Sequence, residues 1–172
     1  ITVGATDIQN GQLRYTPASN STASVNVAFR VQDGGSAANG GQDTSVATST
    51  LTFDITPVND APQGTDFTKG GLEDQIVTFA LADFGFSDPN DIPANKFQNV
   101  RIVAPPANGT LMNGTTIVGP GALVPATAIQ AGNLTFIPIA NANGVAPPYD
   151  SFTFRVQDDG GVSGNGSDTD LT

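Results

Sequence analysis

Short stretches in which apolar and polar residues alternate recur along this chain of 172 residues. The clearest lie at residues 25–31, 51–55, 76–81, 100–103 and 152–156, and weaker ones lie at 13–16, 67–71, 110–112, 115–118 and 134–137. Alternation with a period of two predicts half-buried β-strands. Asn113-Gly114 separates two of these stretches and indicates a hairpin there. Since no segment shows a helical period of 3.6 residues, we predict an all-β fold.

An internal repeat organises these strands. Ile8–Pro17 recurs 121 residues later as Ile129–Pro138, and Phe29–Asp33 recurs 125 residues later as Phe154–Asp158. We therefore interpret residues 1–58 as the C-terminal half of one repeat. Residues 59–172 would be a second repeat that lacks its last strand, which either was trimmed from this chain or comes from another chain. About seven strand positions per repeat suit a β-sandwich. We expect the half-repeat not to fold alone, because it lacks strands to cover its apolar face.

The stretch Pro57–Pro62 joins the two repeats. Each proline fixes its own φ and favours an extended conformation in the residue before it, so the connector should be stiff. Asn59 and Asp60 place hard oxygen ligands at this joint.

Three polar segments should meet beside the connector. Successive strands of a sandwich run antiparallel, which places Asp88 and Asp91, and later Asp158, at the same end as Asn59 and Asp60. Calcium binds six to eight oxygens from carboxylates, amides and carbonyls. The alternative is that these Asp, Asn and Gly residues only form turns.

The same strand directions place other polar residues at the opposite end of the second repeat. These are Glu73, Asp74, Asn141 and Asn143. Two further polar residues, Asp83 and Asn95, are interpreted as structural, and Phe84 and Phe86 as core residues.

Composition narrows the function classes. Sixteen acidic residues against six basic ones give a net charge of −10, which disfavours nucleic acid and anionic membranes as partners. The chain has no Cys and no His. This excludes disulfides, Cys/His zinc sites and catalysis by an imidazole or a thiolate. No apolar run has transmembrane length, so no direct membrane insertion is expected. We predict that the chain is not an enzyme.

Several motifs together resemble the cadherin-like tandem repeats of very large bacterial surface proteins. They are Pro57–Pro62, Glu73-Asp74, Asp83–Pro89, Asn108–Leu111, and Phe152–Asp158 with the following Asp-Gly-Gly. The resemblance implies tandem Ig-like β-sandwiches with Greek-key connections, calcium at the joints, and secretion to the cell surface. By the pattern of animal cadherins, the calcium ligands would be Asn59, Asp60, Glu73, Asp88, Asp91 and Asp158. Asp88–Asp91 replaces the usual Asp-x-Asp, and no acidic segment precedes the sixth strand.

The expected function is therefore a calcium-stiffened stalk segment of an extracellular adhesin or biofilm protein. Its partners would be neighbouring repeats of the same protein, and its receptor is not indicated. An alternative is a fibre subunit that assembles with other copies by inter-chain strand addition. A glycan-binding module using the loops at 35–44 or 139–149 is less favoured, because the chain has no Trp and only Tyr15 and Tyr149.

Overall fold

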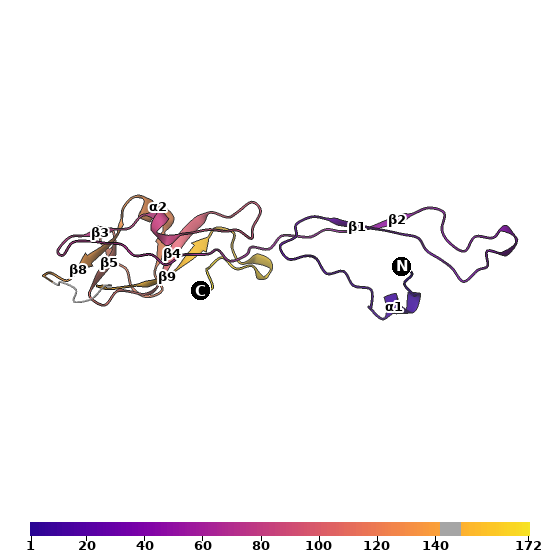
Figure 1. Cartoon of the computed structure of the whole chain (residues 1–172), viewed down its shortest axis with the longest axis horizontal. Coiled ribbons are helices and arrows are strands. Elements are labelled where there is room, and N and C mark those ends of the chain that lie inside the picture. Colours follow the sequence, from indigo (N-terminus) through magenta and orange to yellow (C-terminus); the bar gives the residue numbers. More distant parts are fainter. Residues whose placement is uncertain (142–148) are drawn as a thin grey trace. The chain divides into compact units, whose positions relative to one another are not determined.

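The computed structural model describes residues 1–141 and 149–172. Contacts within the chain define two units, Ile1–Pro57 (unit 1) and Val58–Thr172 (unit 2). The regular secondary structure of both units is mainly strands in antiparallel sheets, with a few short helices (Figure 1). The all-β class predicted from the alternation is confirmed. No helix that the structure describes has the length and apolar character required to span a membrane.

Unit 1 contains one two-stranded sheet. Its elements are the helix α1 (Ala5–Gln9), the strand β1 (Val25–Phe29), the 3-10 turn η1 (Ala38–Gly40) and the strand β2 (Ser49–Phe53). β1 and β2 pair antiparallel, with Val25 opposite Phe53. The Tyr15 ring stacks on Phe53 at a centroid distance of 4.8 Å.

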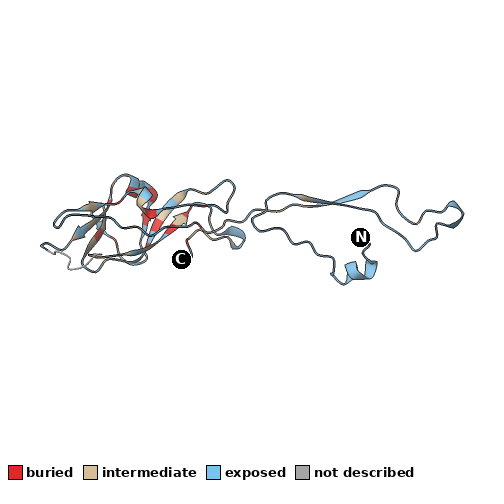
Figure 2. Ribbon diagram, in the orientation of Figure 1, coloured by how far each residue is buried: buried red, intermediate tan, exposed pale blue. Residues whose placement is uncertain are grey.

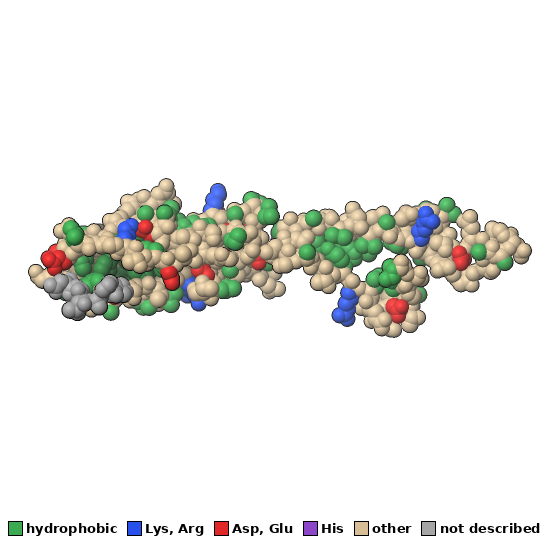
Figure 3. Space-filling model, viewed as in Figure 1, with side chains coloured by type: hydrophobic (Ala, Val, Ile, Leu, Met, Phe, Trp, Pro, Cys, Tyr) green, Lys and Arg blue, Asp and Glu red, His purple; other side chains and the backbone are tan. Residues whose placement is uncertain are grey.

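Unit 1 has no buried residue, as Figure 2 shows by the absence of red from its ribbon. Some of its apolar side chains form a patch on the face shown in Figure 3, and others lie singly on the surface. Leu51, for example, keeps 47% of its surface exposed. Half-covered apolar residues stabilise a fold less than fully buried ones, because stabilisation scales with the apolar area removed from water.

Unit 2 contains two antiparallel sheets. One has four strands in the order β3-β8-β5-β6, and the other has three in the order β7-β4-β9. The elements are β3 (Val77–Thr78), η2 (Leu81–Phe84), β4 (Phe97–Ala104), β5 (Gly109–Asn113), β6 (Thr116–Ile117), β7 (Leu123–Pro125), α2 (Ala126–Gln130), β8 (Leu134–Pro138), β9 (Thr153–Asp158) and η3 (Ser163–Asn165).

Both sheets of unit 2 contribute to one core. Val100, Ile102 and Val156 come from the three-stranded sheet, and Leu111 and Leu134 from the four-stranded one; each is at most 1% exposed. The alternation in β4 explains this arrangement, since successive side chains of a strand point to opposite faces. Five aromatic rings add an edge-on cluster, formed by Phe67, Phe79, Phe84, Phe152 and Phe154.

The repeated Phe-Arg-Val-Gln-Asp motif and the loop after it adopt the same local structure in both units. In unit 1, the Asp33 N–H donates to Asp43 O (2.8 Å) and the Ser45 N–H donates to Val31 O (2.8 Å). In unit 2, the equivalent bonds run from Asp158 to Asp168 and from Asp170 to Val156, both 2.9 Å. We call this pair of bonds the loop ladder. The side chains match as well, because Gln32 donates to Asp43 and Gln157 donates to Asp168.

Several predicted strands differ from the observed ones. Residues 67–71 form no strand, and residues 13–16 form none in unit 1, although their repeat equivalents form β8. The strand predicted at 76–81 is only β3, because the Asp83 carboxylate accepts the Ala80 N–H and starts the turn η2. The predicted hairpin is present as β5–β6; Asn113 pairs with Thr116, so the turn is Gly114-Thr115.

Candidate functional site

Asn59 lies at the centre of a polar cluster at the start of unit 2. Its amide nitrogen Nδ2 donates to Asp158 Oδ1 (3.0 Å), Gly161 O (3.0 Å) and Ser167 O (2.8 Å). A primary amide has only two hydrogens, so three acceptors share two donors. The Asn59 main chain is also held, since Asn59 O accepts the Ser167 N–H at 2.9 Å. The start of unit 2 is therefore tied to the loop after β9.

The loop between η2 and β4 closes the cluster from the other side. Asp91 Oδ2 accepts the Asp60 N–H at 2.9 Å, and Asn95 Nδ2 donates to Asn59 Oδ1. Asp88 Oδ2 accepts the Asn95 N–H at 2.5 Å. These contacts bring together three chain segments that lie far apart in sequence. We refer to Asn59, Asp60, Asp88, Asp91, Asn95 and Asp158 as the joint cluster.

Two carboxylate oxygens of the joint cluster are buried without a partner. Among the residues that the structure describes, no group donates a hydrogen bond to Asp88 Oδ1 or Asp158 Oδ2, and the two residues are only 7% and 1% exposed. A buried polar atom without a hydrogen bond costs about 1–3 kcal/mol, and more if it carries charge. A cation at these oxygens would remove that cost, since buried charges are normally paired or coordinate a metal.

The electrostatics of the cluster favour a positive ion. Burial raises the pKa of Asp88; the Asn95 N–H opposes the rise, and the negative charges of Asp91 and Asp60 add to it. Burial likewise raises the pKa of Asp158, against the hydrogen bonds from Gly160 and Asn59 and with further repulsion from Asp88 and Asp168. The surroundings of Asp88 and Asp158 in the joint cluster therefore disfavour the charged forms of these two carboxylates.

Glycine permits the close approach of the third segment. A Cβ built on Gly160 would collide with the Asn59 side chain, and one on Gly166 would lie 3.1 Å from the Cβ and the main-chain oxygen of Asn59. The Gly160 N–H also donates to Asp158 Oδ1 at 2.8 Å. The Asp-Asp-Gly-Gly turn thus presents both a carboxylate and open space for Asn59.

Glu73 does not belong to the joint cluster. It is exposed in a turn, and none of the hydrogen bonds described connects it to the other predicted ligands. Its neighbour Asp74 accepts the Asn141 N–H at 2.7 Å, as expected for residues at the opposite end of unit 2. Asn143, and most of the 139–149 loop, lie outside the described residues.

Sequence reasoning missed some members of the cluster. The sequence indicates only a structural role for Asn95; in the structure its side chain donates to Asn59 and its N–H donates to Asp88. The carbonyls of Gly161 and Ser167 also contribute oxygens. The Asp-Asp-Gly-Gly motif indicates that the Gly161 carbonyl is available, because glycine turns expose backbone oxygens. Nothing in the sequence distinguishes the Ser167 carbonyl.

Carboxylates alone do not form a metal site here. In residues 1–141 and 149–172, no group of three or more His, Cys, Asp or Glu side chains is arranged to hold a metal ion. The oxygens in the joint cluster are mixed, from carboxylates, an asparagine amide and main-chain carbonyls. That donor set, with its two unpartnered carboxylate oxygens, fits a hard cation such as calcium and would not suit a soft one.

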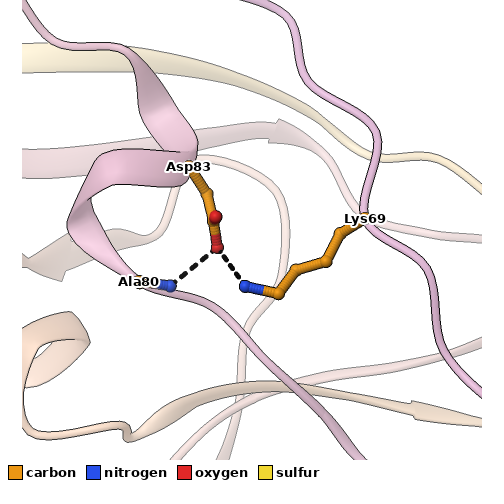
Figure 4. A network of polar contacts seen from close by, with 3 residues as sticks. All are labelled: Lys69, Ala80 and Asp83. Carbon is orange, nitrogen blue, oxygen red and sulfur yellow. Dashed lines mark hydrogen bonds and ion pairs between the residues drawn. The ribbon is translucent and has the colours of Figure 1, made fainter.

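Asp83, in contrast, has a purely structural role. Its Oδ2 accepts the Ala80 N–H at 2.8 Å and pairs with Lys69 Nζ at 2.5 Å (Figure 4). Burial alone would raise the pKa of Asp83, but the bonds from Ala80 and Lys69 outweigh it and hold the pKa below its usual value. This network fixes the turn after β3.

The fold and the joint cluster support only a general description of the protein. It is an all-β protein in which carboxylate and amide oxygens lie together at one end of a two-sheet unit. Comparison with protein-family models, with curated proteins and with solved structures finds no match to this chain.

Proposed function

We propose that this chain is a calcium-stiffened structural segment of a large extracellular protein, such as a bacterial adhesin or biofilm surface protein. Its units would be cadherin-like repeats, that is, Ig-like β-sandwiches with Greek-key connections. The observation that carries the proposal is the pair of buried, unpartnered oxygens Asp88 Oδ1 and Asp158 Oδ2 in one cluster. Both lie among residues that the cadherin-like resemblance assigns to calcium.

The chain's own residues would act as follows. Asp88 and Asp158 supply the free oxygens, and Asp60, Asp91 and Asn59 lie beside them. A bound calcium ion would supply the positive charge that offsets their mutual repulsion. Because Asn59 and Asp60 directly follow the boundary at Pro57, fixing them also fixes the first residues of unit 2. The joint would then be stiff with calcium and more flexible without it.

An extracellular location is part of this proposal. Extracellular calcium modules bind at about 10⁻⁴–10⁻³ M, so such sites fill outside cells and stay empty inside. A chain of this kind would be exported flexible and stiffen afterwards.

The proposal is tested by melting the chain in millimolar calcium, in excess chelator and in magnesium. A rise in Tm specific to calcium is expected, because a ligand that binds only the folded state stabilises it. Small-angle scattering then measures stiffening, with the double variant Asp60→Asn/Asp88→Asn as comparison. An unchanged Tm, or equal flexibility of wild type and variant in calcium, would refute the proposal.

A second candidate is a subunit of a fibre that assembles by strand addition. One observation favours it. Outside the bridge from Gln157 to Thr169, the described part of β9 pairs on one side only, with β4. The repeat equivalents of Thr153 and Phe154 are Ala28 and Phe29, which pair with β2, so this part of the edge is able to accept a strand. Light scattering that shows concentration-dependent polymers would favour the fibre, and a monomer at all concentrations would rule it out.

A glycan-binding role has weaker support. The aromatic side chains are engaged, since Tyr15 stacks on Phe53 and the Tyr149 hydroxyl donates to Asn108 O at 2.8 Å. The hollow of about 440 Å³ beside the 35–44 loop is lined by residues 31–33 and 42–46, none of them aromatic.

A further inference from the structure

Two arginines lie directly opposite each other in the three-stranded sheet of unit 2. Arg101 in β4 pairs in register with Arg155 in β9. Both are exposed, whereas the neighbours Val100, Ile102 and Val156 are buried, so the two arginines lie on the face away from the core. Residues directly opposite in an antiparallel pair have Cβ atoms about 4.5–5.5 Å apart. Like charges at such a position repel each other.

No acidic side chain neutralises this pair in the part of the chain that the structure describes. The ion pair found there joins Lys69 to Asp83, and neither Arg101 nor Arg155 takes part in a side-chain hydrogen bond. The three strands of the sheet contain one acid, Asp158, which is buried on the core side. The segment 142–148 contains no acid at all. The two guanidinium groups thus form a small area of positive charge on a chain whose net charge is −10.

Asp168, the residue before Thr169, is already engaged. Asp168 accepts Gln157 Nε2 at 2.9 Å through Oδ2 and the Thr169 hydroxyl at 2.8 Å through Oδ1.

The pair also lines a hollow. A space of about 380 Å³ is bounded by Arg101, Ile102, Val103, Gly121, Arg155 and Thr169. A Cβ on Gly121 would meet nothing within 4 Å, so this side of the hollow is open. Each guanidinium offers five N–H donors in a planar fork that matches a carboxylate or sulfate.

We propose that Arg101 and Arg155 together bind one oxyanion group, a carboxylate or a sulfate, of a small ligand in this hollow. The anion accepts hydrogen bonds from both guanidinium groups and relieves their repulsion. A second copy of this chain is the less favoured source of the carboxylate, because two chains of charge −10 repel each other. A long polyanion is disfavoured for the same reason. The proposal is independent of the joint cluster and of calcium.

The repeat supplies a matched control inside the same molecule. Arg30 occupies the position of Arg155 in the other copy of the motif Phe-Arg-Val-Gln-Asp. Arg30 Nε donates to the Thr48 hydroxyl at 3.4 Å, and its opposite neighbour is not an arginine. Arg30 should therefore not bind the anion.

The test follows the arginine Nε–Hε signals of the full chain by NMR, in chelator, while sodium sulfate or sodium acetate replaces sodium chloride at constant ionic strength. The signals of Arg101 and Arg155 are expected to shift together and saturate, while those of Arg14 and Arg30 stay in place. Arg155→Gln and Arg101→Gln should each weaken the binding at least about tenfold, as expected for a lost charged hydrogen bond. Arg30→Gln should leave it unchanged.

Three results would overturn the proposal. The first is that the NMR signals of all four arginines shift alike, which would indicate that the salt only screens their charges. The second is equal binding by Arg155→Gln and wild type, with a spectrum that shows the variant folded. The third is a sedimentation experiment in which the chain forms dimers that sulfate dissociates. This would assign Arg101 and Arg155 to a contact between copies of the chain.

Discussion

Asn59 and Asp158 are 99 residues apart in sequence, yet Asn59 Nδ2 donates to Asp158 Oδ1 at 3.0 Å. This bond joins the first residues of unit 2 to the end of its last described strand, β9. The other oxygen of Asp158 is buried and has no hydrogen-bond partner in the part of the chain that the structure describes. The Asp158 carboxylate thus joins two distant parts of unit 2 through one oxygen, and its other oxygen is available to bind a further group.

Removing the Asp158 charge should abolish much of the calcium response. With calcium at about 100 times its Kd, wild type should gain about 2.7 kcal/mol. Asp158→Asn should lose most of that gain, because it removes a charged oxygen from the cluster. Glu73→Gln is the matched control and should keep the full response, since Glu73 lies outside the cluster. Melting in calcium and chelator measures both; a lost response in Glu73→Gln would place that residue in the site after all.

The calcium-free protein should lose stability as pH rises above the ordinary carboxyl range. The pKa values of Asp88 and Asp158 are raised in the folded state, mainly by burial. From about pH 3.9 upward, the folded state therefore retains protons that the unfolded chain has released. Stability contributed by these groups is complete below that pH and is lost as pH rises through the folded pKa values.

Urea unfolding in chelator across this range measures the effect, and Asp158→Asn should make the pH dependence shallower. A wild-type curve as shallow as that of the variant would contradict the assignment of the raised pKa to Asp158.

Adding a methyl group at Gly160 should destabilise unit 2. Its Cβ would collide with the Asn59 side chain, so Gly160→Ala should cost about 1–3 kcal/mol, as overpacking usually does. Gly70→Ala is the control, because no atom of residues 1–141 or 149–172 lies within 4 Å of a Cβ there. Denaturant unfolding compares the two variants, and equal stability would mean that the contact of the loop with Asn59 is not tight.

Asp83→Asn should weaken the turn after β3. It removes the charge that pairs with Lys69 and weakens the bond from Ala80, at a cost of about 0.5–2 kcal/mol. The lowered pKa of Asp83 means that this contribution is lost as pH falls through that pKa. Lys69→Gln should cost less, because the Ala80 bond remains. If both variants unfold alike at neutral pH, the ion pair and not the Ala80 bond fixes the turn.

Leucines at equivalent repeat positions should differ in their effect. Leu134 is fully buried, whereas Leu13 is 57% exposed. Leu134→Ala should cost about 2–5 kcal/mol, and Leu13→Ala about 0.5 kcal/mol or less. Thermal melting of the two variants is a direct comparison. A large loss for Leu13→Ala would show that unit 1 buries its apolar side chains in solution.

The alternation of apolar residues located strands correctly where the chain contains the neighbouring strand with which they pair. β4 shows this, since Val100 and Ile102 point into the core and Arg101 points out. It failed at residues 67–71, because Phe67 joins the aromatic cluster from a segment without strand pairing. It also missed α1 and α2, which have five residues each and are too short to show a helical period.

The joint cluster was predictable only in part. Strand direction alone placed Asp88, Asp91 and Asp158 near Asn59 and Asp60. It could not place Asn95, whose contact depends on the path of the loop between η2 and β4. Glu73 was assigned by resemblance alone, and strand direction already placed it at the other end. Whether these residues bind calcium stays a prediction.

The loop ladder has a consequence for how the chain folds. It forms in unit 1, where no residue is buried, so it requires no hydrophobic core. Its strands are joined by a loop of roughly ten residues, which closes in about 10–100 ns. Contacts so close in sequence form early, because little chain entropy is lost. Each repeat thus carries its own local starting point for folding, and these contacts would form before strands that lie far apart in sequence pair with each other.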